Sequence, residues 1–292
     1  MTLKPGITYM HEHVTIDLSS IKQSDDTILN CFDATVAEFK KLYARGVRNV
    51  IDATVAGMGG DALYVQKVAA QSGINIVQAT GFYVDRFFPP MVRTYSIDEL
   101  AEFMLDEIYR GIGETDVTAG IIGEIGTSKD GFTPDEEKVF RAAAIVHQET
   151  DLPITTHATL GTFAMEQVLL LKSCDVNLEK VVIGHVDLTG DAKYVLNLLE
   201  HGVYVAFDTI GKINYQPDET RCAMLKAIQD AGHIGRVVLS MDITRPSNME
   251  HKGGIGYCYL LDTFVPMMRE HGVTEESIVQ MLETNPMQFF GG

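Results

Sequence analysis

The segment YMHEHV, residues 9–14, carries the pattern from which the rest of the chain can be interpreted. In a β-strand, residues i and i+2 point to the same face, so His11 and His13 project together while Glu12 points away. Two neutral imidazoles that converge on one point are half of a transition-metal site. Two surface histidines can also fall at this spacing by chance, so further ligands must come from elsewhere in the sequence.

Short β-branched runs recur along the chain, and longer segments between them repeat apolar residues every three or four positions. The eight runs are residues 7–11, 47–53, 74–80, 119–125, 153–157, 180–186, 203–208 and 236–242. Alternation of this kind implies parallel strands joined by crossover helices, and eight strands close a barrel. We expect a single-domain (β/α)8 TIM barrel over residues 1–292. A doubly wound open sheet is the alternative, but no glycine fingerprint follows the first run.

Two of the helical segments carry clear terminal signals. Asp191 is the expected N-cap of DAKYVLNLLEHG, and Gly202 is its expected terminator. Thr274 is the expected N-cap of TEESIVQMLETNP, with Pro286 following its end.

Composition limits the partners that this chain can have. With 46% apolar and 22% charged residues, the 292-residue chain is a soluble globular protein with a sizeable core. Its net charge of −17 disfavours nucleic acid and anionic membrane surfaces as partners. We find neither an apolar run long enough to cross a bilayer nor a signal peptide, and therefore expect a cytoplasmic protein. The four scattered cysteines are expected to be reduced.

Metal-ligating residues gather at the carboxyl ends of the predicted strands, where TIM barrels place their chemistry. The residues that share this position are His11, His13, Glu124, His157, His185 and Asp242. Buried polar groups without partners are costly, and a metal is the simplest common partner. Six ligands exceed the need of one catalytic zinc and suit two divalent ions that share a carboxylate and a hydroxide. We expect zinc, while manganese and cobalt fit the same ligands.

Other candidate residues have simpler interpretations. Asp187 and Asp208 are either loop caps or supports for the ligands. The remaining histidines are interpreted as surface or capping residues, and they are His147, His201, His233, His251 and His271.

Several motifs together resemble the phosphotriesterase family of the amidohydrolase superfamily over essentially the whole chain. They are YMHEHVTIDL, GVRNVI, ATGFYVD, AGIIGEIGTS, EEKVFRAAA, ITTHAT, VVIGHVDL, VAFDTIGK, VVLSMDITR and NPMQFFGG. The resemblance implies one metal held by His11, His13 and Asp242 and a second, more exposed metal held by His157 and His185. Most relatives bridge the two metals with a carboxylated lysine, whereas this strand ends in Glu124, which needs no carbon dioxide. Lys129 is expected in the following loop, unmodified.

The resemblance also implies a hydrolase in which a metal-bridging hydroxide attacks a phosphoester, lactone or carboxyl ester. Asp242 is the expected proton acceptor. Tyr83 either lies near the leaving group or packs the barrel rim. Lys212 and Arg245 either contact a small anionic substrate or form ion pairs with nearby Asp208 or Asp218.

Two alternatives remain at this point. A metal-stabilised barrel that binds a small molecule with little catalysis fits the same motifs. A barrel isomerase or aldolase would need a lysine at a strand end or a phosphate-binding loop, and we find neither. The apolar loop at residues 87–90 suits either a homodimer contact or a substrate lid.

Overall fold

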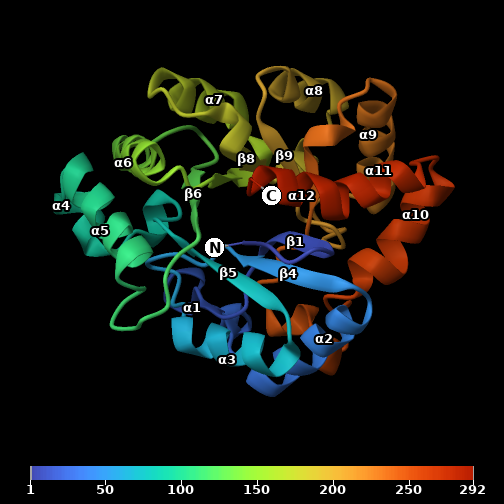
Figure 1. The fold of residues 1–292 in the computed structure, drawn as a ribbon, viewed down its shortest axis with the longest axis horizontal. Helices are drawn as coiled ribbons and strands as arrows, with labels where there is room; N and C mark the ends of the chain where they lie inside the picture. Colours follow the sequence, from blue (N-terminus) through green and yellow to red (C-terminus); the bar gives the residue numbers. More distant parts are fainter. Residues whose placement is uncertain (1, 292) are drawn as a thin grey trace.

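The computed structural model describes residues 2–291 of the chain. Within this range, eight parallel strands form one sheet in the order β1-β4-β5-β6-β7-β8-β9-β10. The strands are β1 (Ile7–Glu12), β4 (Val47–Asp52), β5 (Asn75–Thr80), β6 (Ile121–Thr127), β7 (Ile154–Ala158), β8 (Val181–Gly184), β9 (Tyr204–Phe207) and β10 (Val237–Leu239). They lie at the centre of the molecule with helices outside them (Figure 1). The predicted TIM-barrel fold is confirmed.

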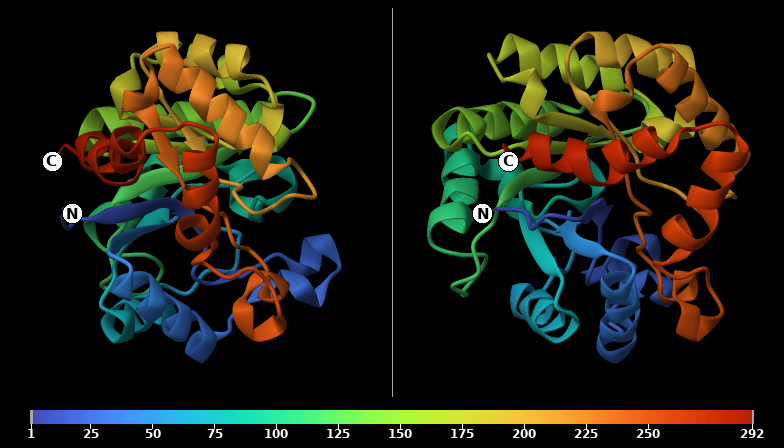
Figure 2. Two further views of the ribbon diagram at one scale, coloured as in Figure 1. Left: turned by 90° about the vertical axis from the view of Figure 1, so that its right-hand side faces the viewer. Right: turned by 45° about the vertical axis from the view of Figure 1, so that its right-hand side comes forward.

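Helices connect successive strands and cover the outside of the barrel, as two further views show (Figure 2). The longer ones are α2 (Phe32–Ala44), α3 (Ala62–Ser72), α5 (Ile97–Tyr109), α6 (Pro134–Thr150), α7 (Ala164–Ser173), α8 (Ala192–Glu200) and α9 (Asp218–Asp230). Shorter ones are α1 (Ser19–Lys22), α4 (Pro90–Thr94), α10 (Val265–Glu270), α11 (Glu275–Val279) and α12 (Asn285–Phe289). A two-residue pair, β2 (Ile16–Asp17) and β3 (Ile28–Leu29), is antiparallel and lies outside the barrel sheet.

The strands are buried on both faces, because the interior of the barrel is packed and helices cover its exterior. Every residue of β6, IIGEIGT, and of β8, VVIG, is buried. This explains why the sequence shows continuous apolar runs rather than strict alternation. Polar residues also interrupt the runs, among them Glu124 in the middle of β6 and His157 near the end of β7. The prediction that the strand of Glu124 ends in this residue was wrong, because β6 continues to Thr127.

The predicted strands agree with the structure within two residues at each end, except for the eighth. That strand ends at Leu239, three residues before Asp242. Asp242 and His185 both adopt left-handed backbone conformations, with φ of 51° and 60°. This conformation cannot continue a ladder, so the prediction that these two residues end their strands was wrong, and both lie just beyond.

Asp191 caps α8 as predicted, since its side chain accepts hydrogen bonds from Lys193 N and Tyr194 N. Thr274 caps α11, but the prediction that the helix ends before Pro286 was wrong. The helix continues through a π-helical turn, Gln280–Thr284, into α12, where Pro286 is an early residue. The wider turn accommodates a proline ring and its missing N–H group.

Of the two interpretations of His147, the surface one was wrong, because the side chain is buried, whereas its position at the helix end agrees with a capping role. It lies in the last turn of α6, and its Nδ1 is 2.8 Å from Leu152 O. This contact ties the end of the helix to the start of the next strand.

Two observations bear on membranes and disulfides. No helix among residues 2–291 is long and apolar enough to cross a membrane. All four cysteines are free, in line with the expected reduced state.

Gly123 in β6 provides a test of how the barrel wall is packed next to Glu124. Its φ is +100°, and an added Cβ would lie 1.9 Å from Thr155 O on β7. We predict that Gly123→Ala lowers the free energy of unfolding by about 3 kcal/mol, since overpacking and left-handed strain add. Gly202→Ala is the control, because φ is +89° there and the added Cβ meets no atom of the described chain within 4 Å. It should cost only about 1 kcal/mol in urea unfolding. Equal losses of unfolding free energy in the two variants would contradict the close packing of Gly123 against Thr155.

Candidate metal centre

The carboxylate of Glu124 lies at the centre of the six predicted ligands. Its Oε2 is 3.1 Å from His157 Nδ1, 3.3 Å from His11 Nε2 and 3.8 Å from His185 Nε2. Its Oε1 is 3.4 Å from His13 Nε2. One carboxylate on β6 therefore faces a nitrogen of all four histidines, which come from three other segments of the barrel.

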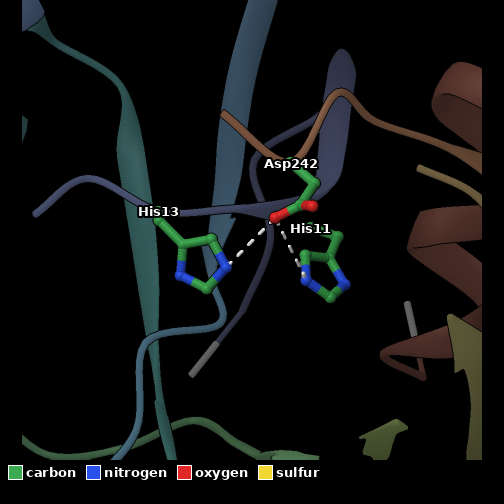
Figure 3. A group of neighbouring side chains, drawn as sticks. All are labelled: His11, His13 and Asp242. Carbon is green, nitrogen blue, oxygen red and sulfur yellow. Dashed lines mark ion pairs between the residues drawn. The ribbon is translucent and has the colours of Figure 1, made fainter. Parts of the chain in front are cut away.

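Asp242 completes the group on the β1 side. Its Oδ1 lies 3.2 Å from His13 Nε2 and 4.0 Å from His11 Nε2. Figure 3 shows the Asp242 carboxylate between the two imidazole rings. His11 and His13 reach it together because they are two residues apart in an extended segment. The structure thus brings together all six residues that the sequence analysis singled out.

His185 and Asp242 reach the centre through strained backbone. A left-handed conformation in a residue other than glycine is uncommon and persists only where the surroundings hold it. Both are buried, with side-chain exposures of 4% for His185 and 12% for Asp242. Strain at two residues of one buried group is typical of a functional site.

Asp208, just after β9, supports two of the histidines. Its Oδ1 is 2.8 Å from His185 Nδ1 and also accepts a hydrogen bond from His185 N at 2.9 Å. Its Oδ2 lies 3.2 Å from His11 Nδ1. A proton held on His185 Nδ1 leaves its Nε2 free to face Glu124, and Asp208 also lies beside His11 without a well-directed hydrogen bond, so Asp208 is a support rather than a loop cap.

Threonines support the other two histidines in the same way. Thr54 Oγ1 donates to Asp52 Oδ1 at 2.7 Å, so its lone pair accepts from His13 Nδ1, which lies 2.8 Å away. Thr159 Oγ1 donates to Thr127 O at 2.7 Å and faces His157 Nε2 at 3.1 Å. These contacts direct His13 Nε2 and His157 Nδ1 toward Glu124 in the neutral, ligating tautomer.

The buried carboxylates of this group need compensating positive charge. Glu124, Asp208 and Asp242 bring three buried carboxylates together, and Lys212 pairs with Asp242. Burial opposes ionisation of Glu124, but His11 and His157 outweigh it and hold its pKa well below the usual range. Burial likewise disfavours charge on His13, but its contacts with Asp242 and Glu124 raise its pKa to about 9. Burial and the neighbouring His185 lower the pKa of His157 to about 4.

These residues fit bound cations. Two sets of ligand atoms converge within 4.8 Å, one from His11, His13 and Asp242 and one from His11, Glu124 and His185. Neither ring nitrogen of His11 makes a well-directed hydrogen bond within residues 2–291, although both are fully buried. Imidazole and carboxylate suit zinc and similar divalent ions. His157 faces Glu124 but lies outside the second set, in contrast to the ligand set implied by the resemblance.

A cavity of about 360 Å³ opens onto His13, Glu124, His157, His185 and Asp242. Its other lining residues include the three predicted substrate contacts, Tyr83, Lys212 and Arg245. Tyr83 OH lies 3.3 Å from His157 Nε2. Lys212 pairs with Asp242, and Arg245 lies 3.4 Å from Asp26, so neither pairs with Asp208 or Asp218.

Comparison with known proteins identifies the family of this chain. A model of the phosphotriesterase family matches residues 2–290. The chain belongs to the phosphotriesterase family. It is 48% identical over 285 residues to the phosphotriesterase homology protein of Escherichia coli strain K12, covering 98% of each chain. The crystal structure of the phosphotriesterase homology protein from Escherichia coli complexed with phosphate in its active site matches with a TM-score of 0.97 and 48% identity, over 98% of this chain and 99% of that one.

More distant relatives have names that describe activities. The chain is 30% identical over 299 residues to the aryldialkylphosphatase of Saccharolobus solfataricus, covering 98% of this chain and 95% of the relative. The lactonase Lmo2620 from Listeria monocytogenes matches at a TM-score of 0.93 and 29% identity, over 98% of this chain and 94% of that one. The resemblance drawn from the sequence motifs, to the phosphotriesterase family, is confirmed.

The position of Glu124 explains how this member of the phosphotriesterase family places a carboxylate between the histidines. The strand delivers the carboxylate directly, with 2% of the residue exposed. Lys129 lies exposed in the loop beyond β6, as expected.

Sequence reasoning missed four residues near the centre. Thr54 and Thr159 orient histidines, and their only signal was that they follow strand ends. Lys22 lines the cavity from α1, a four-residue helix too short to leave a periodic pattern. Glu12 was interpreted as pointing away, which is correct, but the contacts that it makes there could not be seen in the sequence.

Asp208→Asn tests the supporting contacts. The asparagine amide has only one acceptor oxygen, so its NH₂ group must face Nδ1 of either His185 or His11. Where that nitrogen carries a proton, two hydrogen-bond donors then oppose each other. We predict a loss of about 2–3 kcal/mol in the free energy of unfolding, measured with urea on chelator-treated protein. Asp191→Asn is the control, since asparagine caps a helix as well as aspartate and should change stability by less than about 0.5 kcal/mol. If the Asp208 variant were as stable as the control, the supporting role would be wrong.

Proposed function

We propose that this chain is a binuclear, divalent-metal-dependent hydrolase that cleaves an ester-type bond, with zinc as the expected metal. The observation that carries the proposal is the contact of Glu124 with nitrogens of four histidines at 3.1–3.8 Å. His11, His13 and Asp242 would hold one cation, and His157 and His185 the other, with Glu124 between them. The family and the names of its relatives support hydrolysis.

A pair of divalent cations supplies, when bound, an acidified water and an electrophilic pull on the phosphoryl or carbonyl oxygen. The protein contributes fixed geometry. Asp208, Thr54 and Thr159 hold the tautomers of the histidines, so that each ligating nitrogen is unprotonated. Burial of the group excludes bulk water and strengthens its electrostatic interactions.

Asp242 is the proposed acceptor of the proton that the attacking water loses. Its Oδ1 faces His13, and its Oδ2 pairs with Lys212 at the cavity wall. A carboxylate at the boundary between the ligands and the cavity can take a proton and release it toward solvent. Tyr83 OH lies beside His157 and is placed to hydrogen-bond a substrate oxygen on that side.

The cavity favours a small anionic substrate. Three basic side chains, Lys22, Lys212 and Arg245, line it in a protein whose net charge is −17. Because both Lys212 and Arg245 pair with acids in the structure, a bound anion would compete with Asp242 and Asp26 for them. The phosphate in the active site of the Escherichia coli relative is consistent with an anion at this position. Phosphoesters and carboxylated or phosphorylated lactones both satisfy these contacts.

The proposal is tested by removing the metal. Chelator-treated protein should lose turnover in a panel of phosphotriesters, phosphodiesters and lactones, and two equivalents of Zn²⁺ should restore it. Glu124→Gln should lower kcat/KM by about 100-fold or more, because the amide is a weaker ligand for two cations. Glu107→Gln is the matched control, a buried glutamate elsewhere that accepts from Thr80 at 2.6 Å, and it should retain activity.

Asp242→Asn distinguishes catalysis from binding alone. This variant should retain zinc, measured by elemental analysis, and lose turnover, because asparagine can ligate through oxygen but cannot accept the proton. Full zinc loading with no turnover of the panel by the unaltered protein would favour the alternative of a metal-stabilised binding barrel.

A separate prediction concerns Lys212 and Arg245, the residues proposed to contact an anionic substrate. Lys212→Ala and Arg245→Ala should each raise KM for an anionic substrate by about 10-fold, with less effect on a neutral one. Lys252→Ala, a nearby exposed lysine that is not among the cavity-lining residues, is the control. Unchanged kcat/KM for every accepted anion in the double variant would remove both residues from substrate binding.

A further inference from the structure

The barrel is closed between β10 and β1 in a different way from its other seams. Each of the other neighbouring strands forms a backbone ladder, but β1 and β10 are the ends of the hydrogen-bonded order within residues 2–291. β10 has only three residues, and Asp242 beyond it is left-handed, so the extended backbone cannot continue. The bond from Asp242 N to His11 O, 3.2 Å long, links the two segments beyond the end of β10.

The carboxylate of Glu12 takes the place of the missing ladder. Its Oε1 accepts hydrogen bonds from Ser240 Oγ and from Met241 N, both at 2.8 Å. Its Oε2 accepts from Ile243 N at 3.0 Å. Glu12 is fully buried, and Ser240 Oγ in turn accepts from His11 N at 3.0 Å.

These contacts lie on both sides of Asp242. Met241 and Ile243 are its immediate neighbours, and both of their N–H groups are held by the same carboxylate. A residue clamped on both sides has little freedom to leave the left-handed conformation that aims its side chain at His13 and His11 (Figure 3). Glu12 itself lies between these histidines in sequence and points to the opposite face of the strand.

We propose that Glu12 is a positioning residue that fixes Asp242 against His11 and His13 and thereby sets the affinity of the cation that these three residues hold. This inference rests on the proposed metal-dependent function. The middle residue of the HEH segment then has a role distinct from that of its neighbours, because the histidines supply two ligands and the glutamate between them positions the third.

Glu12→Gln is the sharpest variant, because it keeps the size of the side chain and changes one oxygen into an amino group. Glu12 uses both oxygens as acceptors, whereas glutamine has one. In either orientation, an NH₂ group must face Ile243 N or the pair formed by Met241 N and Ser240 Oγ. At least one side of the clamp on Asp242 is therefore lost.

The experiment titrates chelator-treated protein with Zn²⁺ by calorimetry and records the visible spectrum of the Co²⁺-loaded protein. The unaltered protein should bind two equivalents. Glu12→Gln should bind one of the two at least about 10-fold more weakly and show an altered cobalt spectrum. A role in stability alone would lower the melting temperature without changing either readout.

Glu136→Gln is the matched control. Glu136 is also fully buried and accepts from the backbone N–H groups of Asp85, Ser128 and Thr133, none of them adjacent to a proposed ligand. It should lose stability but keep the zinc affinity of the unaltered protein. If Glu12→Gln does not fold, Ser240→Ala replaces it, since it removes one donor to Glu12 and should weaken one site by about 3-fold.

The outcomes separate the two proposals. If the unaltered protein binds two zinc ions and the Glu12 or Ser240 variant binds them equally well, the positioning role is wrong while the proposed function stands. If the unaltered protein binds no stoichiometric zinc, both are wrong. Equal loss of zinc affinity in the Glu136 variant would also overturn the positioning role, because it would trace the effect to general destabilisation.

Discussion

The structure depends on one electrostatic constraint: Glu124, Asp208 and Asp242 are buried together at one end of the barrel, where carboxylates need compensating positive charge. Four imidazoles and Lys212 surround them, and imidazoles can take protons or bind cations in the same positions. The hydrogen bonds behind His13 and His157 fit the outer nitrogen of each ring as the donor, so the inner nitrogen of the neutral ring is the one available to a cation. Bound cations would supply the positive charge that the carboxylates need, while the histidines that hold them stay neutral.

The sequence predicted the barrel well because its signals are local. Each buried strand is a short apolar run, and each ended within two residues of its prediction except the last. That exception is informative, since Asp242 itself adopts a left-handed conformation that no residue pattern indicates. The π-helical turn before Pro286 was missed for a similar reason, because a proline signals a helix end unless the preceding turn widens.

The six ligands could be predicted because each lies at or just beyond the end of a predicted strand and belongs to a type that binds metals. The supporting threonines could not, since Thr54 and Thr159 acquire their roles only when loops from different strands meet. For Asp208 the sequence left a support and a loop cap as alternatives, and the contact with His185 decides between them. Glu12 is the extreme case: its partners lie about 230 positions away in sequence, and its separations from Ser240 and Ile243 are 228 and 231 residues. Long-range contacts between a side chain and the backbone leave no pattern along the chain.

The central claim is that Glu124 lies between two cations, and anomalous diffraction tests it most directly. Crystals grown with zinc and measured on both sides of the zinc absorption edge should show two peaks roughly 3.5–4 Å apart. Each peak should lie within bonding distance of one oxygen of Glu124, with His11, His13 and Asp242 around one peak and His157 and His185 around the other. A single peak away from Glu124, or no peak from protein with demonstrated zinc in solution, would contradict the account.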